Sequence, residues 1–291
     1  MAPIIAPELR SEAEGLAARL PPLMAEAERV AATVAAGGHG RRRPGMGETF
    51  WQYRPHRPED GFAAIDWRRS GRSDALYVRE NEWEAANTVW LWRDGRAGMD
   101  WRSKTASASK RDRAAVILTA LTSLLIDGGE RCGVLGESAA PRAGRIGYER
   151  CAYRLIAGPG DTEGLTSPDI SRFSLIVLAS DFFEPLDVWR DRLGKLVGRG
   201  VRGVALQVVD PAEADFGFSG RTRFFAPGGG EDLVFGRAET ARARYLKRFA
   251  AHRAAFSDLV SRAGLTFVAH RTDEPPTNAL LALYAALGAE V

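Results

Sequence analysis

After residue 88, short apolar runs alternate with longer helical patterns, and this alternation constrains the fold more than any other feature. Five runs rich in β-branched and aliphatic residues predict strands at 88–93, 131–136, 174–180, 201–209 and 265–270. Helical patterns follow at 109–127, 148–157, 186–198, 238–263 and 277–287. Strands that alternate with helices of this length are typical of a mostly parallel α/β sheet. We also expect an antiparallel edge strand at 139–146 and a hairpin at 218–236.

Two segments with different residue compositions precede this pattern. Residues 11–36 have apolar residues at helical spacing, and Pro21-Pro22 must break or bend the helix because proline removes a helix hydrogen bond. Residues 39–87 are rich in arginine, aromatic residues, glycine and proline, which predicts extended ribbons and loops. We therefore expect an N-terminal helical segment at 1–38, an Arg/aromatic ribbon packed on the sheet at 39–87, and the α/β domain at 88–291.

Composition places the chain among ordinary globular proteins. Its 291 residues carry a net charge of only +3, and all but four of the 40 basic residues are arginine. Cys132 and Cys151 lack the spacing of a zinc site, and so few thiols suggest a reducing compartment. The longest apolar stretch, 116–126, is shorter than the roughly 18 residues of a membrane span, and the N-terminus does not resemble a signal peptide. We expect a cytoplasmic protein that does not enter the membrane.

Motifs for several common chemistries are missing from the sequence. It contains no GxGxxG after the first strand of the sheet, no GxxxxGK[ST] and no GxSxG, so nucleotide binding and serine-hydrolase chemistry lack their usual signals. His39, His56, His252 and His270 are scattered without metal-ligand spacing. For His252, on a long predicted helix, we expect a solvated or capping role. The sequence thus predicts no cofactor and no enzymatic activity.

The arginine-rich segment supports two interpretations. Residues 41–79 hold nine arginines and five acids, with aromatic residues between them. Rings and guanidinium groups together can bind single-stranded nucleic acid. Alternatively, arginines such as Arg68 and Arg69 pair with Asp60, Asp66, Glu80 and Glu82 and fix the ribbon in place. The interleaved acids favour ion pairs, and nucleic-acid binding remains the alternative function.

Two carboxylates, Asp94 and Asp181, each follow an apolar strand. Because ligands bind at the carboxyl ends of strands in open α/β sheets, these residues could share a hard cation such as Mg²⁺. The alternative is that each only caps the helix that follows it. The spacing alone leaves both possibilities open.

The ribbon carries a motif that resembles a known family. The stretch Gly47-Glu-Thr-Phe-Trp-Gln-Tyr-Arg-Pro, followed by Ile65-Asp-Trp-Arg-Arg-Ser-Gly-Arg72, is similar to the signature of the DUF58 family. Further similarity lies at 76–80, 210–213, 245–252 and 272–273, so the resemblance covers most of 41–287. The residues that carry the motif are Gly47, Phe50, Tyr53, Arg54, Asp60, Ile65, Asp66, Trp67 and Arg72.

The resemblance implies a Rossmann-type, von Willebrand factor A-like domain. It also implies a non-catalytic adaptor that works with a MoxR-type AAA+ ATPase in the maturation of an unknown client protein. A domains hold an ion with an Asp-x-Ser-x-Ser sequence after the first strand, a threonine from a second loop and an aspartate after a later strand.

At those positions the sequence departs from the A-domain pattern. Asp94 and Asp181 occupy the acidic positions, but Arg96 and Gly98 replace both serines, and Thr162 is a weak candidate for the threonine. We therefore predict a degenerate ion site that does not bind Mg²⁺. We further hypothesise that Arg96 turns inward and bridges the two carboxylates in place of the ion. The run Arg41-Arg42-Arg43 is expected to be exposed and to form a possible partner-binding arm.

Overall fold

The structure is a computed structural model that describes residues 22–35, 50–55, 65–71, 75–81, 88–158, 165, 170–172, 174–225 and 232–289. Contacts divide the chain into two compact units. The larger unit comprises Met1–His39 and Asn87–Val291, and the smaller comprises Gly40–Ala86. Each unit is described by itself below.

The larger unit is built on a five-stranded sheet in which every pair of neighbouring strands is parallel. In spatial order the strands are β4 (Arg131–Val134), β3 (Thr88–Arg93), β5 (Leu175–Ser180), β6 (Arg202–Val209) and β9 (Leu265–Arg271). The chain starts in β3, moves outward to β4, and then returns across β3 to β5. The winding therefore reverses between β3 and β5, and such a reversal point is where open α/β sheets bind their ligands.

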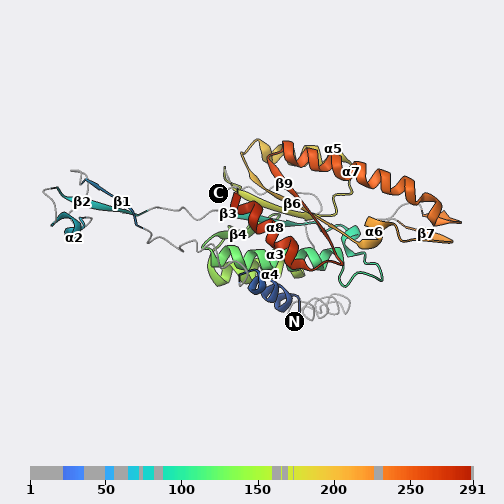
Figure 1. Ribbon diagram of the computed structural model, residues 1–291, viewed down its shortest axis with the longest axis horizontal. Helices are drawn as coiled ribbons and strands as arrows, with labels where there is room; N and C mark the ends of the chain where they lie inside the picture. The colour runs from blue at the N-terminus through green and yellow to red at the C-terminus, as the bar shows by residue number, and fades with distance from the viewer. Residues whose placement is uncertain are drawn as a thin grey trace, which may run out of the picture. The chain divides into compact units, whose positions relative to one another are not determined.

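Helices cover both faces of the sheet (Figure 1). One layer contains α3 (Lys110–Asp127), α4 (Gly144–Ala157) and α8 (Pro276–Ala289), and the helix at residues 22–35 packs into the same core. The opposite layer contains α5 (Leu186–Val197) and α7 (Arg242–Arg262). Short helical turns complete the unit: η2 (Ala97–Asp100), α6 (Pro211–Asp215) and η3 (Ala238–Ala241).

Strand β3 shows how the sheet separates two cores. Val89 and Leu91 face the α3–α4–α8 layer, whereas Trp90 and Trp92 face the α5–α7 layer, and all four side chains are buried. Trp92 packs edge-on against Trp189 of α5, with ring centroids 5.9 Å apart. A strand buried on both faces has no polar alternation, which is why the sequence shows a nearly continuous apolar run.

The predicted order of strands and helices from residue 88 is confirmed, with ends that shift by a few residues. The expected edge strand at 139–146 is wrong. Arg142 makes only an isolated antiparallel bridge with Cys132, and α4 begins at Gly144, whose positive φ of 68° turns the chain into the helix. The expected hairpin is present as β7 (Thr222–Phe224) paired antiparallel with β8 (Leu233–Phe235).

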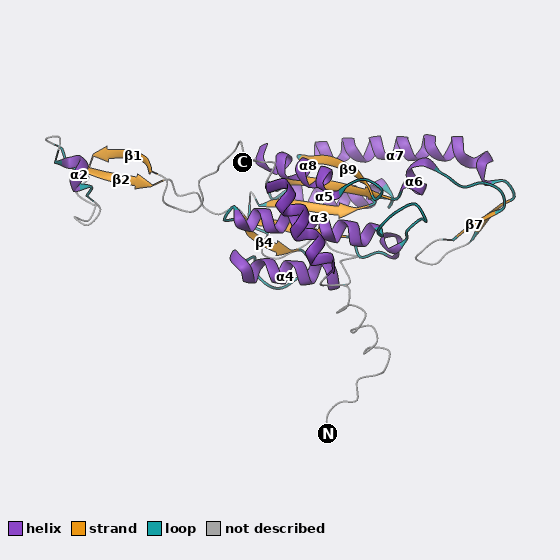
Figure 2. Ribbon diagram, turned by 60° about the horizontal axis from the view of Figure 1, so that its bottom comes forward, coloured by secondary structure: helices purple, strands orange, loops and turns teal. Residues whose placement is uncertain are grey.

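The smaller unit is a two-stranded ribbon. β1 (Phe50–Pro55) pairs antiparallel with β2 (Tyr77–Asn81), and the short helix α2 (Trp67–Ser70) lies beside them (Figure 2). Ile65 is buried, but Trp67 is 63% exposed. The indole of Trp67 is therefore not covered within this unit. No helix in the described ranges is long and apolar enough to cross a membrane.

A buried histidine makes the stability of the larger unit depend on pH. His270 of β9 is 2% exposed, and its Nε2 atom has no hydrogen-bond partner among the described residues. Burial and the charge of Arg113 lower the pKa of His270 to about 4. The unfolded chain binds a proton here below about pH 6.5, while the folded chain does so only near pH 4. This residue therefore removes stability as pH falls between these values, and the stability is regained as pH rises.

We predict that His270→Leu flattens this pH dependence. In urea titrations at pH 7 and pH 4.5, the wild type should lose about 2–3 kcal/mol more unfolding free energy on acidification than the variant does. Equal losses in the two proteins would contradict a neutral, buried His270.

Candidate functional site: an ion-paired centre at the carboxyl end of the sheet

The two predicted carboxylates meet at the reversal point of the sheet. Asp94 follows β3 and is fully buried, and Asp181 follows the neighbouring β5 and is 5% exposed. Neither caps the next helix, so that alternative is wrong. Ser109 caps α3, and α5 begins after Pro185 without a side-chain cap. Instead, each carboxylate accepts the backbone N–H two residues ahead, which turns the loop sharply away from the strand.

Arg96 lies between these carboxylates. Its Nε atom is 3.0 Å from both carboxylate oxygens of Asp94, and its Nη2 atom also bonds Asp94 Oδ2. The same Nη2 is 3.4 Å from Asp181 Oδ1, and Nη1 is 3.0 Å from Glu184 Oε2. The guanidinium thus turns inward, as the hypothesised bridge requires. Its planar fork of donors suits several carboxylates at once.

A second cation, Lys110, completes the centre from the first turn of α3. The side chain is only 1% exposed, and Nζ lies 2.9 Å from Asp181 Oδ2 and 2.5 Å from Glu213 Oε1. Asp181 therefore accepts from Lys110 on one oxygen and from Arg96 on the other. We name Asp94, Arg96, Lys110, Asp181, Glu184 and Glu213 together the ion-paired centre.

Neighbouring groups hold the carboxylates in position. Ser180 Oγ donates to Asp94 Oδ2 at 2.6 Å and accepts from the backbone N–H of Phe182 at 2.9 Å. Phe182 has a positive φ of 55°, which is uncommon for a bulky residue. Its carbonyl oxygen is 2.8 Å from Nε2 of His252 on α7. His252 is thus half-buried and supports the loop after β5, rather than being solvated or capping its own helix.

The third supporting segment is α6, which begins directly after β6. Asp210 and Glu213 form a capping box: Ala212 N–H donates to Asp210 Oδ1, and Asp210 N–H donates to Glu213 Oε2. The other Asp210 oxygen accepts the backbone N–H of Ser103 at 2.8 Å, in the loop after η2. The cap thereby fixes Glu213 with one oxygen directed to Lys110 and also ties down the β3–α3 loop.

The pKa values of Lys110 and Glu213 reflect both their burial and their ion pairs. Burial disfavours the charged form of Lys110, but Asp181 and Glu213 outweigh it and raise the pKa of this lysine. Burial also raises the pKa of Glu213, against the opposing effect of Lys110. Lys110 is therefore charged at neutral pH, and the four carboxylates of the centre all contact a cation.

These residues do not suit a bound metal ion. Hard cations require about six oxygen ligands, whereas Arg96 and Lys110 already occupy the carboxylate oxygens that would ligate one. Within the described part of the chain, no group of three His, Cys, Asp or Glu side chains is arranged to hold a metal. A Cβ added at Gly98 would lie 3.4 Å from Asp181 Oδ2, so position 98 faces the ion-paired centre.

Several predicted positions lie outside the described residues: Arg41, Arg42, Arg43, Gly47, Asp60, Arg72 and Thr162. For Phe50, Tyr53 and Arg54 only the backbone in β1 is described. Sequence reasoning missed Lys110 and Glu213. Lys110 is one of four lysines in an arginine-rich chain, and its position at the start of a helix after a carboxylate-bearing loop was the available signal. Glu213 lies in the stretch 210–213 that resembles the DUF58 family, but the sequence alone assigned it no role.

The fold and this centre define an α/β protein whose carboxyl-end loops are held by fixed ion pairs. The family model described as "Protein of unknown function DUF58" matches residues 52–255, and the chain belongs to this family. Its curated relatives include the uncharacterised proteins Rv1480 of Mycobacterium tuberculosis and Mb1516 of Mycobacterium bovis. Each is 27% identical in an alignment of 258 residues that covers 82% of this chain and 80% of the relative.

Two solved structures are also similar. One is the conserved hypothetical protein BatB from Bacteroides thetaiotaomicron, at 12% identity and a TM-score of 0.40 over 70% of this chain and 98% of that one. The other is an aerotolerance-related membrane protein from Bacteroides fragilis carrying multiple mutations to serine. It is 14% identical, with a TM-score of 0.40 over 70% of this chain and 100% of that one.

We predict that Lys110→Ala destabilises the protein by about 3–5 kcal/mol, because it leaves Glu213 without a cation and the buried Asp181 with only its longer contact to Arg96. Chemical denaturation at pH 7 measures the effect. The matched control is Arg111→Ala, the next residue, whose exposed pair with Asp100 should be worth less than about 1 kcal/mol. Similar losses in both variants would contradict a special role for Lys110.

A second prediction concerns the ion. Calorimetric titration of the wild type with Mg²⁺ and Mn²⁺ should show no tight binding. The double variant Arg96→Ser, Gly98→Ser removes one cation and returns two hydroxyl ligands, so it should gain measurable affinity. Gly98→Ser alone retains Arg96 and serves as the control. Tight binding by the wild type would refute the replacement of the ion by Arg96.

Proposed function

We propose that this chain is a non-catalytic, protein-binding adaptor with a von Willebrand factor A-like, Rossmann-type fold, which meets its partner through the carboxyl-end loops around the ion-paired centre. The observation that carries this proposal is that Arg96 and Lys110 contact all four carboxylates of the centre. In this arrangement no ion has to be bound or released when a partner docks. The loops are instead held permanently in one conformation, ready to present their surface.

The same contacts argue against an enzyme. Each carboxylate of the centre is engaged by a cation, so none is left as a general base for an incoming substrate. Asp94 and Lys110 are titratable side chains that could take part in acid–base chemistry, but both are buried beneath the loops. The centre therefore suits a structural support for a binding surface.

The surface above the centre has the mixed character of a docking site. Phe183 is 38% exposed and stacks edge-on against Phe249 of α7, with its ring 5.1 Å from Lys110 Nζ. Arg102, Lys104 and Thr105 of the neighbouring loop are also exposed. An aromatic residue surrounded by polar groups is typical of protein interfaces.

The resemblance described above names the partner that we propose, a MoxR-type AAA+ ATPase or its client. Cys132 and Cys151 are both unpaired and buried, which is compatible with a reducing compartment such as the cytoplasm.

Direct binding tests this proposal. The full chain is immobilised, and a purified MoxR-type ATPase from the same host is passed over it. Lys104→Glu with Phe183→Ser should weaken binding at least about tenfold, while Arg145→Glu, an exposed change on α4, should not. Treating the chain with EDTA and then desalting it should leave binding unchanged. Loss of binding after the EDTA treatment would count against the proposal. So would binding by the double variant that is as tight as binding by the wild type.

Nucleic-acid binding by the smaller unit is the second candidate, and the exposure of Trp67 favours it. Trp67 and the neighbouring Arg68 are both exposed, so a ring and a guanidinium are available for stacking and phosphate contacts. Phosphate binding weakens steeply with salt, whereas a mostly apolar protein interface does not. Tight, strongly salt-dependent binding of single-stranded DNA that is lost in Trp67→Ala would favour nucleic-acid binding as the function.

A further inference from the structure

Helix α7 carries an unusual concentration of positive charge. It contains six basic residues and one acid, a net charge of +5, whereas the whole chain carries only +3. All six basic side chains are exposed, and none takes part in an ion pair among the described residues. The six are Arg242, Arg244, Lys247, Arg248, Arg253 and Arg262. Outside α7 the chain has 34 basic and 36 acidic residues, a net charge of −2, so the positive charge of the protein is concentrated on this helix.

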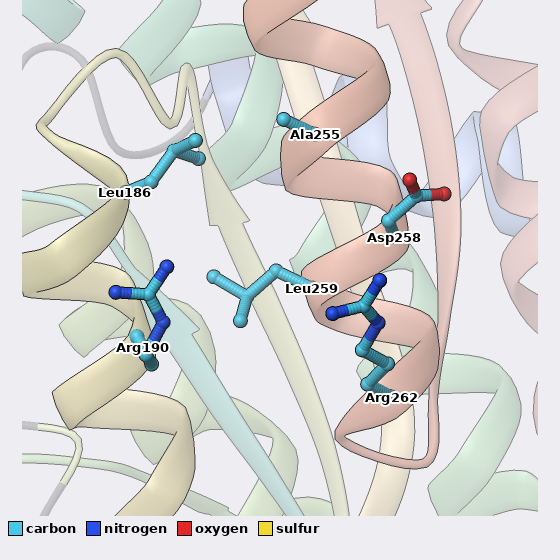
Figure 3. Close-up of a pocket in the computed structure, with 6 residues that line it drawn as sticks. All are labelled: Leu186, Arg190, Ala255, Asp258, Leu259 and Arg262. Atoms are coloured by element: carbon cyan, nitrogen blue, oxygen red, sulfur yellow. The ribbon is translucent and has the colours of Figure 1, made fainter.

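Next to this basic helix lies a hollow of about 210 Å³ between α5 and α7. Leu186, Ala255 and Leu259 supply its apolar lining, and Arg190 and Arg262 stand at its sides. Figure 3 shows the Leu259 side chain between the two guanidinium groups, with Arg190 on α5 and Arg262 on α7. We name this hollow the α5–α7 groove. Leu186 and Leu259 are half-buried, so apolar surface is available there for a partner.

We propose that the α5–α7 groove and the basic face of α7 bind an acidic, amphipathic helix of a partner protein. An apolar side chain of that helix would pack on Leu259, and its carboxylates would reach Arg190 and Arg262 as charge-assisted hydrogen bonds. This surface lies on the layer formed by α5 and α7, and the inference goes beyond the docking surface proposed above.

The apolar lining of the groove favours this occupant over other polyanions. Leu186 and Leu259 offer a contact that an apolar helix face can use and a phosphate backbone cannot, and the partner's carboxylates would lie beside Arg190 and Arg262, away from Asp258. The exposed positions from Arg244 to Arg262 include no aromatic ring on which a base could stack, because Tyr245 and Phe249 stack on each other and Phe256 is buried. Ala243, Ala250, Ala251 and Ala254 are the exposed apolar residues of this helix, and they are too small to anchor it in a lipid bilayer.

The dimensions also fit a helix. Arg244 and Arg262 are separated by five turns of α7, or about 27 Å. A partner helix of about 18 residues spans the same length. The small alanine side chains on the exposed face would let such a helix approach α7 closely.

A defined probe tests the inference on the full chain. The probe is a fluorescein-labelled helical peptide of about 18 residues, with leucines along one face and glutamates on both sides of it. Fluorescence anisotropy is measured at about 150 mM salt, where only short-range charge pairs persist. The wild type should bind the peptide, and Arg190→Glu with Arg262→Glu should weaken binding at least about tenfold.

Two further variants separate the groove from general electrostatics. Arg29→Glu with Arg145→Glu makes the same change in charge on exposed positions of the opposite layer, and should alter affinity less than about twofold. Ala255→Glu places a longer, negative side chain in the groove and should also abolish binding, with a melting curve to confirm that the variant folds. Lys104→Glu with Phe183→Ser, which tests the preceding proposal, should leave peptide binding intact.

Several results would overturn the inference: no binding of the peptide by the wild type, equal losses in the groove and control variants, or persistence of binding in Ala255→Glu. Equal or tighter binding of a single-stranded DNA of the same charge, or of vesicles containing phosphatidylserine, would also overturn it. Either result would show that the surface binds polyanions whether or not they carry an apolar face.

Discussion

The arrangement of the carboxyl-end loops depends on the neutralisation of buried carboxylates by two cations from different parts of the chain. Asp94 and Asp181 are brought together because β3 and β5 are neighbours at the reversal point of the sheet. Two buried carboxylates repel each other unless positive charge lies between them. Arg96 supplies that charge from the loop after β3, and Lys110 supplies it from α3. Because Lys110 also contacts Glu213, helix α6 after β6 becomes part of the same network.

Neutralisation by two cationic side chains has different physical consequences from neutralisation by an ion bound at the same place. A bound cation exchanges with solvent and makes the conformation of the loops depend on its concentration. Covalently attached cations are always present, so the loops lose that dependence. The cost is desolvation of two positively charged side chains, and a buried ion pair often contributes little net stability. What such a network supplies is a defined geometry, and removal of any one member leaves uncompensated charge.

The sequence predicted the sheet better than the details of the site, for physical reasons. Strands β3, β5 and β6 are buried on both faces, so their sequences are continuous apolar runs that indicate strands directly. The positions of Asp94 and Asp181 followed from strand order. The role of Lys110 could not be predicted from local pattern, because its partners are 71 and 103 residues away.

Helix α7 links the ion-paired centre to the rest of the α5–α7 layer. His252 holds the Phe182 carbonyl, the ring of Phe256 stacks on Phe182 at 4.3 Å, and Phe249 contacts Phe183. The loop that supplies Asp181 is thus supported by the inner side of the same helix whose outer side is strongly basic. Close-packed aromatic contacts of this kind resist small displacements. A partner bound to the outer side of α7 and a partner bound above the centre would therefore be held at a fixed separation and orientation, which is the mechanical property that an adaptor between two proteins requires.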